Sequence, residues 1–515
     1  MRGKLAIFVL CLAFAIRLFS FLFTAVINQD GVLYIHQARA IYYGMWDSIL
    51  GCGMGYLSNY SIFIVGAYAV VRDWVIAAKS VSLLFGTLTL VPLYLLLREF
   101  FRKQIVFSAC LAFALIPVFV DKSVDVVRDP VYWFFLVFGL YFFVAQIGKR
   151  DRLYLILSSI SLLMATWARI EAVLFIAVTF VYLIFSMEER KVQRLSLFAI
   201  PIIGAALSCI AVLIIFNIDG DDPFRINMIK TRVSAPLFQY SNLRAELLEL
   251  MNQPLGITVP GFLHKARNLA WLVALGTIVK YAITAYFYPF FLLFLIGSAG
   301  IWAKVKQDQR ILYLVVLSAS ALILLYVQVL QTWMMFNRFF ALFILPSFIL
   351  VGFGLERTIG FLQSKFKLRE YVAITIVCLL MLACALPKSL NPRETDKLVF
   401  KEIGEIIAER EGNAQEIKVA TSLPLIRWIS FYANLGYRGA PCPQKNYALV
   451  DSSHLGYDIF VEKLKGRGIQ YILWDERHWP KGILESMSTQ GSKDFIRVGT
   501  WSHPDTGKLI LFEMI

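Results

Sequence analysis

The sequence predicts a polytopic α-helical membrane protein that ends in a soluble α/β domain. Of its 515 residues, 59% are hydrophobic and 17% are charged, whereas soluble domains are roughly 45–50% apolar and 25% charged. Apolar runs such as 5–27 and 76–97 carry few charges and are long enough to cross a hydrocarbon core of about 30 Å. After residue 387 the chain becomes more polar and changes to short alternating helix and strand patterns.

Eleven membrane spans are expected, and together with their connections they form a membrane domain over residues 1–387. The first run continues past Arg17 without a signal-peptide cleavage site, so it is interpreted as an uncleaved span. Two long connections, 28–75 and 217–280, interrupt the series. The spans lie at about 5–27, 76–97, 105–120, 131–147, 153–167, 171–187, 195–216, 281–303, 311–330, 336–354 and 371–387.

The distribution of positive charge predicts the orientation in the membrane. The connections on the side of the N-terminus contain 18 Lys and Arg residues, and the short connections on the opposite side contain six. Because cytoplasmic connections carry the excess of Lys and Arg, the N-terminus is expected in the cytoplasm. An odd number of spans then puts 28–75, 217–280 and the domain 388–515 on the periplasmic or extracellular side of the cytoplasmic (inner) membrane.

The net charge of +15 belongs to this membrane pattern and does not indicate a nucleic-acid partner. From Lys388 to the end there are 17 basic and 16 acidic residues, so the excess lies in the hydrophobic region. Five of the seven cysteines fall in apolar runs, while Cys52 and Cys442 lie in polar surroundings. No CxxC pair and no disulfide framework is apparent.

The polar segments have secondary-structure patterns of their own. The apolar stretch 60–71 is too short to span and is expected to be a helix along the outer membrane surface, and 271–279 is similar. In the C-terminal domain we expect helices near 394–410, 424–435 and 457–468 and strands at 417–422 and 469–476. Two alternating stretches around a Pro-Asp-Thr-Gly turn predict a final β-hairpin over 495–515.

Asp30 is the main candidate for a functional residue, and it lies directly after the first span in the segment "NQDGVLYIHQARAIYYG". One interpretation is structural, because Asp is a good N-cap and Tyr34, Ala38 and Ile41 follow at helical spacing. The other is functional: Asp30 could serve as general base for an acceptor held at the membrane surface. His36 lies in the same segment, and solvated or structural histidine is the default interpretation for it.

Further candidates lie in the short outer connections. Arg128 could bind a phosphate in a bidentate manner, and Asp129 could orient a partner or help to hold a divalent cation. Arg169 and Glu171 could pair between two spans, and Arg338 could meet the phosphate of a lipid carrier. The alternatives are ion pairs within interfacial turns and contact with ordinary lipid headgroups. Arg17, within the first span, needs an internal acceptor. The acidic run Asp219, Asp221 and Asp222 lacks the EF-hand spacing and is expected in a loop.

Several short segments follow one another in a characteristic order: Asp30, Tyr34, Ala38 and Gly44 in the first outer segment, "AKSVSLLFGTLTLVPLYLLLREFF", the Asp-Pro at Asp129, "ARIEAV", and "NRFFALFILP" with Arg338. These segments and their order resemble the C-superfold (GT-C) membrane glycosyltransferases, in particular the protein mannosyltransferase-like (glycosyltransferase family 39) and aminoarabinose transferase-like group. The resemblance departs at Gly31, where the family commonly has a second acid, and at "GYLSNYSIF", where the family has a Pro-rich sequence.

The resemblance implies an inverting glycosyltransferase that moves a sugar from a polyprenyl-phosphate donor to a glycan, lipid or protein acceptor at the outer membrane face. Asp30 would be the catalytic base. Arg128, Arg169 and Arg338 would bind the donor phosphate, and Tyr34, His36, Asp129 and Glu171 would support them. The sequence identifies no specific cofactor, and a divalent metal ion at Asp129 is a candidate. A lipid-linked polysaccharide polymerase or ligase, and a transporter or flippase of lipid-linked sugars, are the alternatives.

Overall fold

The computed structural model describes residues 4–185, 191–215, 226–253, 258–480, 482 and 493–515. These fall into two compact units. The first comprises Met1–Ile16, Phe85–Asp121 and Asp129–Ser389, and the second comprises Arg17–Leu84, Lys122–Arg128 and Leu390–Ile515. The segment that carries Asp30 and the C-terminal domain therefore belong to the same unit.

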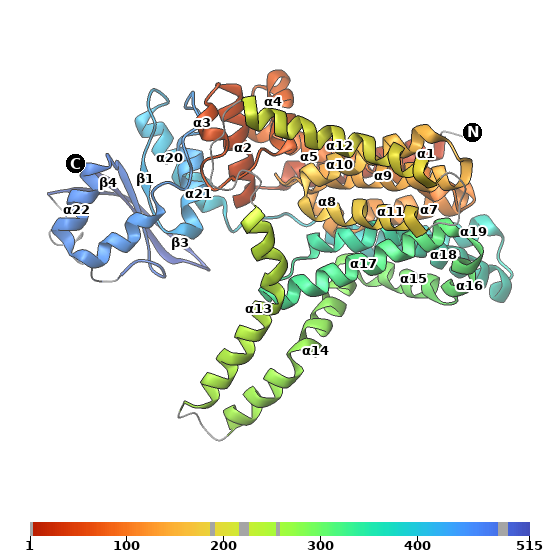
Figure 1. The fold of residues 1–515 in the computed structure, drawn as a ribbon. Coiled ribbons are helices and arrows are strands. Elements are labelled where there is room, and N and C mark those ends of the chain that lie inside the picture. Colours follow the sequence, from red (N-terminus) through yellow and green to blue (C-terminus); the bar gives the residue numbers. More distant parts are fainter. Residues whose placement is uncertain (1–3, 186–190, 216–225, 254–257, 481, 483–492) are drawn as a thin grey trace. The chain divides into compact units, whose positions relative to one another are not determined.

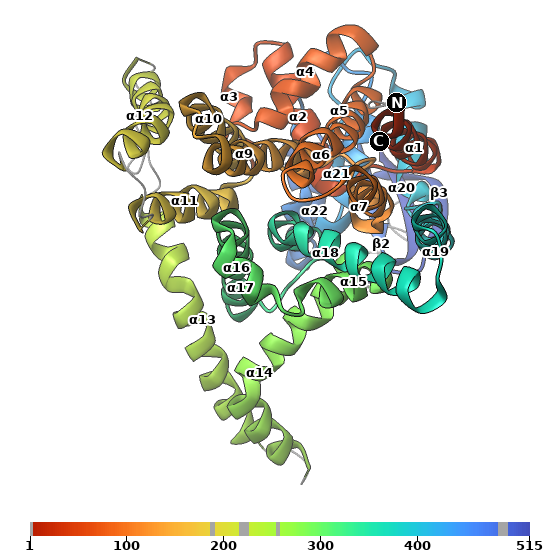
Figure 2. The same cartoon turned by 90° about the vertical axis from the view of Figure 1, so that its right-hand side faces the viewer.

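Helices make up the first unit (Figures 1 and 2). In both views α13 and α14 form a hairpin that extends away from the other helices of the unit. Helix α18 is buried along most of its length, with Phe348 and Leu345 fully enclosed. Besides part of α1 (Lys4–Phe23) and of α5 (Trp74–Leu88), the helices are α6 (Leu90–Arg98), α7 (Lys103–Leu115), α8 (Pro117–Lys122), α9 (Asp129–Lys149), α10 (Arg152–Ala168), η1 (Ile170–Ala172), α11 (Val173–Phe185), α12 (Lys191–Ile215), α13 (Ile226–Met251), α14 (Thr258–Tyr286), α15 (Tyr288–Ser298), α16 (Ile301–Gln307), α17 (Gln309–Thr332), η2 (Asn337–Phe340), α18 (Ala341–Phe366) and α19 (Glu370–Ser389).

The expected polytopic membrane architecture is confirmed. Among the described residues, eight helices are long and apolar enough to cross a membrane, and a bent pair of helices could supply a ninth. Four shorter apolar helices accompany them. Each of the eleven runs expected from the sequence coincides with at least one helix. The continuous span expected at 281–303 is wrong: the backbone turns at Phe287 (φ 67°) and Gly300 (φ 61°), and α15 and α16 are bent by 59°.

The segment 217–280, expected as an outer loop, is helical over the part that the structure describes. Helix α14 starts at Thr258 and runs to Tyr286 as one of the eight potential spans, and the stretch 271–279 lies within it. The polar "HKARN" sequence interrupts the apolar pattern near its start, which is why hydropathy alone does not indicate one long helix. The acidic run Asp219, Asp221 and Asp222 lies outside the described residues.

The second unit joins the segment 28–75 to the C-terminal domain. Its first part contains α2 (Gln29–Tyr42), α3 (Trp46–Ile49) and α4 (Asn59–Val71). The short apolar helix expected at 60–71 is α4; Ser58 caps its start, and Arg72, in the left-handed region, ends it. Tyr60 of α4 donates to Ala78 and lies 2.8 Å from the Ser82 hydroxyl, both of α5, so the two helices are tied by polar contacts.

The C-terminal part is the expected α/β domain. A four-stranded sheet has the order β1-β2-β4-β3, in which β1 and β2 are parallel and the other pairs antiparallel. The predicted hairpin is confirmed as β3 and β4, closed at His503 and Gly507. Ile472, Phe460 and Phe512 belong to its apolar core. The elements are α20 (Leu398–Glu411), β1 (Val419–Ala420), α21 (Leu423–Ala433), η3 (Tyr447–Leu455), α22 (Tyr457–Gly466), β2 (Tyr471–Asp475), β3 (Phe495–His503) and β4 (Gly507–Met514).

Candidate functional site

Asp30 lies in the first turn of α2 but does not cap it. The N-cap is Asn28, whose side-chain oxygen accepts a hydrogen bond of 2.8 Å from the Asp30 backbone N–H. The interpretation of Asp30 as N-cap is therefore wrong, because Asn28 already fills that role. The Asp30 carboxylate is 47% exposed. It stands at the helix N-terminus, where the helix dipole favours a negative charge.

The connection before α9 holds the start of α2 in place. Asp125 accepts hydrogen bonds from the backbone N–H of Asn28 (3.1 Å) and from its side-chain amide (3.4 Å), and Lys122 donates to the same carboxylate at 2.9 Å. Burial raises the pKa of Asp125, but Lys122 and the amide donors lower it more, so the net pKa lies below its ordinary value. Part of the dense charge in this connection thus has a structural function.

Arg128 and Tyr34 are brought together by a residue that the sequence did not single out, Tyr56. Arg128 Nη1 donates to the Tyr56 hydroxyl at 2.5 Å, and its guanidinium lies 5.3 Å from the centre of the Tyr56 ring. The Tyr56 and Tyr34 hydroxyls are 3.5 Å apart. Because Tyr34 follows Asp30 by four residues on α2, both side chains lie on one face of that helix. A single tyrosine in the segment 28–75 is too common to have indicated these contacts in the sequence.

Gly31 packs directly against the second connection. A Cβ on Gly31 would lie 2.6 Å from the Val126 Cβ and 2.7 Å from the Val126 carbonyl oxygen. Neither contact is tolerable without movement of the backbone. This close packing explains why no second acid follows Asp30 in this chain.

Helix α21 of the C-terminal domain runs beside α2 and brings Arg427 to Asp30. Arg427 Nη1 lies 3.4 Å from Asp30 Oδ1. At the same end, Gln29 donates to the carbonyl of Pro424 at 2.5 Å. The sequence predicted the helix but gave no role to Arg427, since one Arg on an apolar helix is not a motif.

Near the other end of α2, the buried side chains of Arg39 and His36 bind backbone carbonyls of the segment that follows α21. Arg39 donates to Gly439 (2.7 Å), Tyr437 (2.5 Å) and Asn434 (3.1 Å). Burial lowers the pKa of Arg39 to about 10 and also lowers that of His36. His36 Nδ1 lies 3.1 Å from the carbonyl oxygen of Pro441, which can only accept, so the ring donates. The geometry gives His36 a docking role.

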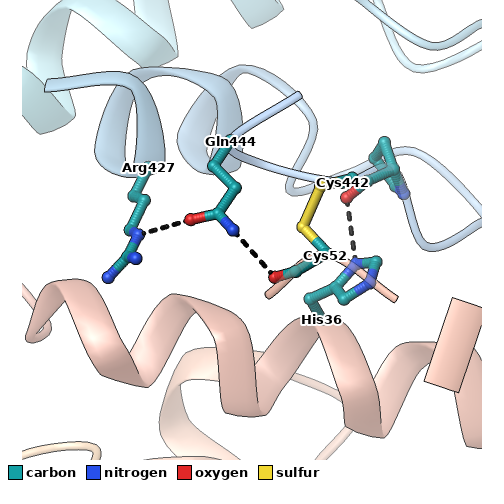
Figure 3. The surroundings of a disulfide bond; sticks show 6 residues. His36, Cys52, Arg427, Cys442 and Gln444 are labelled. Atoms are coloured by element: carbon teal, nitrogen blue, oxygen red, sulfur yellow. Dashed lines mark hydrogen bonds between the residues drawn. A yellow bond between two sulfur atoms is a disulfide. The ribbon is translucent and has the colours of Figure 1, made fainter. Parts of the chain in front are cut away.

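A disulfide closes the same region, although the sequence showed no disulfide framework. Cys52 and Cys442 are joined across 390 residues. Figure 3 shows the bond between the segment 28–75 and the C-terminal domain, with His36 on one side and Gln444 on the other. The signal in the sequence was that these are the two cysteines in polar surroundings. The pairing itself, between distant segments, had no sequence pattern.

Two buried cations support the end of α1 in the second unit. Arg17 donates from Nε to the Ser123 hydroxyl at 3.1 Å, which supplies the internal acceptor that this residue was expected to need. Lys79 of α5 donates to the carbonyls of Phe21 (2.6 Å) and Thr24 (3.3 Å). The two Lys79 bonds satisfy carbonyl groups at the C-terminal end of α1 and directly after it.

In the first unit, Arg169 is engaged by two carboxylates. It pairs with Asp129 and, at 3.0 Å, with Glu171, and its side chain is 5% exposed. Burial lowers the pKa of Arg169, but the two carboxylates raise it to a net value above the ordinary one. Two cations lie near the Phe339 ring, with its centre 4.9 Å from the Arg169 guanidinium and 5.4 Å from that of Arg338. Arg338 is the more accessible of the two.

The candidate metal position at Asp129 gains no support from the geometry, because Arg169 occupies the carboxylate. Among the described residues, one group of three side chains could bring ligand atoms together: Asp396, His503 and Asp505, all within 4.8 Å. However, His503 Nδ1 accepts from the Asp505 N–H at 3.2 Å, so the neutral ring carries its proton on Nε2, which faces Asp396 at 3.7 Å. Metal-binding imidazoles instead donate through their second nitrogen. This group is a His–carboxylate contact.

Comparisons with known proteins agree with this architecture. A family model described as dolichyl-phosphate-mannose-protein mannosyltransferase matches residues 61–216. A comparison with curated proteins gives no match. Among solved structures, ArnT from Cupriavidus metallidurans bound to undecaprenyl phosphate has a TM-score of 0.60 at 13% identity, over 99% of this chain and 98% of its own.

Two further structures are similar at comparable levels. The Archaeoglobus fulgidus oligosaccharyltransferase in its apo form has a TM-score of 0.55 at 14% identity, over 99% of this chain and 74% of its own. The arabinofuranosyltransferase AftD from Mycobacteria has a TM-score of 0.55 at 14% identity, over 100% of this chain and 42% of its own. At these identities the likeness is one of fold.

Proposed function

We propose that this chain, which has the GT-C glycosyltransferase fold, transfers a sugar from a polyprenyl-phosphate donor to an acceptor at the outer face of the cytoplasmic membrane. The acceptor is a glycan, a lipid or a protein. The matched family model and the undecaprenyl phosphate in one of the similar structures support this class of donor.

The observation that carries the proposal is the position of Asp30. Its half-exposed carboxylate stands at the start of α2, on the same helical face as Tyr34, whose hydroxyl is linked through Tyr56 to Arg128. A base and an anion-binding group therefore belong to one small region of the second unit. This is the pair of functions that transfer from a phosphate-linked sugar needs.

In the proposed reaction, Asp30 removes the proton from the acceptor hydroxyl or amine as that group attacks the anomeric carbon. The bond from that carbon to the phosphate oxygen breaks, and the polyprenyl phosphate leaves with the electron pair. One displacement inverts the anomeric centre. Arg128, with Tyr56 as its neighbour, stabilises the charge that develops on the phosphate oxygen.

The other candidate residues have distinct proposed roles. Arg338, which is stacked on Phe339, is a second phosphate ligand. Arg169 organises Asp129 and Glu171, which favours a positioning role over direct contact with the donor. His36 supports the site by docking the C-terminal segment on α2.

The proposed location on the outer side of the membrane is supported by the disulfide. Disulfides persist in oxidising compartments and are rare in the cytosol. Cys52 and Cys442 join the first outer segment to the C-terminal domain, so both must lie on the same side. The excess of Lys and Arg in the opposite connections agrees with this orientation.

The substitution Asp30→Asn tests the proposal, because it keeps the size of the side chain but removes the base. Purified protein in nanodiscs would be assayed for release of polyprenyl phosphate and for transfer of label from a panel of undecaprenyl-phosphate sugars to membrane lipids and glycans. The variant should retain its thermal stability and lose transfer by 100-fold or more, the scale of general-base catalysis of about 10²–10⁴. Full activity in Asp30→Asn would refute the assignment.

Analysis of the products, together with a transport assay in proteoliposomes, separates the alternatives. A polymerase or ligase would extend a glycan already linked to a lipid, whereas a flippase would move the donor across the bilayer without forming a glycosidic bond. A discontinuous helix such as α15 and α16 also occurs in transporters. Transport of the intact donor in both the wild type and Asp30→Asn, without a covalent product, would support the flippase.

A further inference from the structure

We infer that Arg427, in the C-terminal domain, is a positioning residue for the Asp30 carboxylate, and that the Cys52–Cys442 disulfide holds Arg427 in place. This inference rests on the proposed function, because it assigns a task to the neighbour of the proposed base. It also gives the C-terminal domain a part in the reaction.

The first step of the argument is the register between two helices. Gln29, at the start of α2, contacts Pro424 at the start of α21, and Arg39, near the end of α2, contacts Asn434 at the end of α21. Arg39 follows Gln29 by ten residues, and Asn434 likewise follows Pro424 by ten residues. The helices therefore run side by side in the same direction, and Arg427 comes to lie opposite Asp30.

The second step is that Gln444 holds the Arg427 side chain in position by a hydrogen bond. Its Nε donates to Gln444 Oε1 at 2.9 Å, and the Gln444 amide donates in turn to the Cys52 carbonyl at 3.0 Å, as Figure 3 shows. Gln444 also passes close over Gly53, where a Cβ would lie 2.4 Å from its amide nitrogen. A larger residue at position 53 would displace Gln444 from this path.

The third step is the place of the disulfide. Cys442 precedes Gln444 by two residues, and Cys52 supplies the carbonyl that Gln444 binds. The disulfide therefore joins the two chain segments covalently beside the hydrogen bond between Gln444 and the Cys52 carbonyl. The bond restricts the separation of the two segments and, with it, the position of Arg427.

Stability alone does not account for this arrangement. An ion pair in which Asp30 is 47% exposed and Arg427 is 23% exposed contributes little to the free energy of folding. Such a pair does not need a supporting amide, a packed glycine and a disulfide. A catalytic carboxylate does need such support, because its orientation must be held within a fraction of an ångström by neighbouring groups.

The task of Arg427 is accordingly to hold one oxygen of Asp30, so that the carboxylate keeps a fixed orientation towards the acceptor. It acts through Asp30 and does not touch the sugar or the phosphate. Loss of Arg427 should therefore lower kcat and leave donor binding unchanged.

The experiment compares Arg427→Gln and Arg427→Lys in the full-length protein, with Arg410→Gln as a matched control. Arg410 forms an exposed pair with Glu513 elsewhere in the same unit. Arg427→Gln should lower kcat for transfer by about 10–100-fold, with KM for the donor and affinity for undecaprenyl phosphate changed by less than twofold. Arg427→Lys should recover part of the loss, and Arg410→Gln should resemble the wild type in every readout.

A coupled set of variants tests the role of the disulfide. Cys52→Ser with Cys442→Ser should lower kcat in the same direction as Arg427→Gln, and adding Arg427→Gln to that pair should cause little further loss, because both act on one device. Multiplicative losses would overturn the link between the disulfide and Arg427.

The outcomes separate this inference from the proposed function. If Asp30→Asn abolishes transfer while Arg427→Gln retains full kcat, the function stands and the inference is wrong. A raised KM with unchanged kcat in Arg427→Gln would also overturn it, since Arg427 would then bind the donor directly. If Asp30→Asn is fully active, the proposed function fails and the inference fails with it.

Discussion

Gly31 and Val126 touch so closely that the Cβ of any other residue at position 31 would lie 2.6 Å from the Val126 Cβ. This contact joins the first turn of α2 to the connection that contains Asp125 and Arg128. It sets the spacing between the proposed base and the proposed phosphate ligand, since both flank the contact in the sequence.

Gly31→Ala should therefore lower both stability and activity. The added methyl group must push α2 away from Val126, and overpacking of this kind costs about 1–3 kcal/mol. The melting temperature in nanodiscs, measured by intrinsic fluorescence, should fall. The control is Gly66→Ala in α4, where a Cβ would meet nothing within 4 Å. That change should be neutral or stabilising by up to about 1 kcal/mol. Equal effects of the two substitutions would contradict the prediction.

The features that could be predicted from sequence are those with a local pattern. The hairpin of β3 and β4 follows from alternation around a Pro-Asp-Thr-Gly turn, and α4 follows from an apolar run too short to span. The choice of Asp30 rests equally on local context, directly after the first span. Each of these patterns lies within one short segment, so it can be recognised without knowledge of the fold.

The features that could not be predicted join distant segments. Arg427 and Asp30 are 397 residues apart, and the disulfide closes 390 residues. Even the cap of α2 depends on such a contact, because Asn28 and Asp30 are both good capping residues. Asn28 takes the position while Asp125 holds it from another connection. Propensity alone cannot choose between the two.

Arg39 should be important for docking of the C-terminal domain on α2. Arg39→Met keeps an apolar stem but removes the guanidinium donor from the carbonyls of Gly439, Asn434 and Tyr437. The Asn434 and Tyr437 carbonyls keep a backbone donor, so the largest cost falls on the Gly439 carbonyl. A lost hydrogen bond that strands a buried acceptor costs about 1–3 kcal/mol, so a decrease of roughly 2–4 kcal/mol in stability is expected. Limited proteolysis should cleave the C-terminal domain of the variant faster. The exposed pair of Arg410 provides the comparison, and Arg410→Gln should cost at most about 1 kcal/mol. Equal protease resistance of Arg39→Met and the wild type would contradict the assignment.

His36 should make stability depend on pH in a defined direction. Burial lowers its pKa in the folded chain below the ordinary value of 6.5, and the nearby Arg39 lowers it further. As the pH falls through 6.5, the unfolded chain takes up a proton before the folded chain does. The contribution of His36 is therefore complete above that pH and is lost progressively below it.

The measurement is the melting temperature of wild type and His36→Gln between about pH 8 and pH 5.5, a range that brackets the ordinary histidine pKa. Gln can donate to the Pro441 carbonyl but does not titrate. The wild type should lose more stability across the range than the variant, so the two curves should converge at low pH. Parallel curves would show that His36 does not titrate differently in the folded and unfolded chains.

Arg169 and Arg338 both contact the Phe339 ring, yet their substitutions should affect stability and lipid binding differently. Arg169→Ala leaves Asp129 buried beside Glu171 without a cation, and breaking a buried pair in this way costs about 3–5 kcal/mol. Arg169→Ala should therefore reduce the yield of folded protein and the melting temperature.

Arg338→Ala removes a more accessible cation, so it should leave the melting temperature nearly unchanged. It should weaken binding of undecaprenyl phosphate about 10-fold, which corresponds to the loss of one charge-assisted contact of about 1.5 kcal/mol. Native mass spectrometry of both variants with added undecaprenyl phosphate measures the second effect directly. A stable Arg169→Ala protein that has lost lipid binding would reverse the two roles and make Arg169 the phosphate ligand.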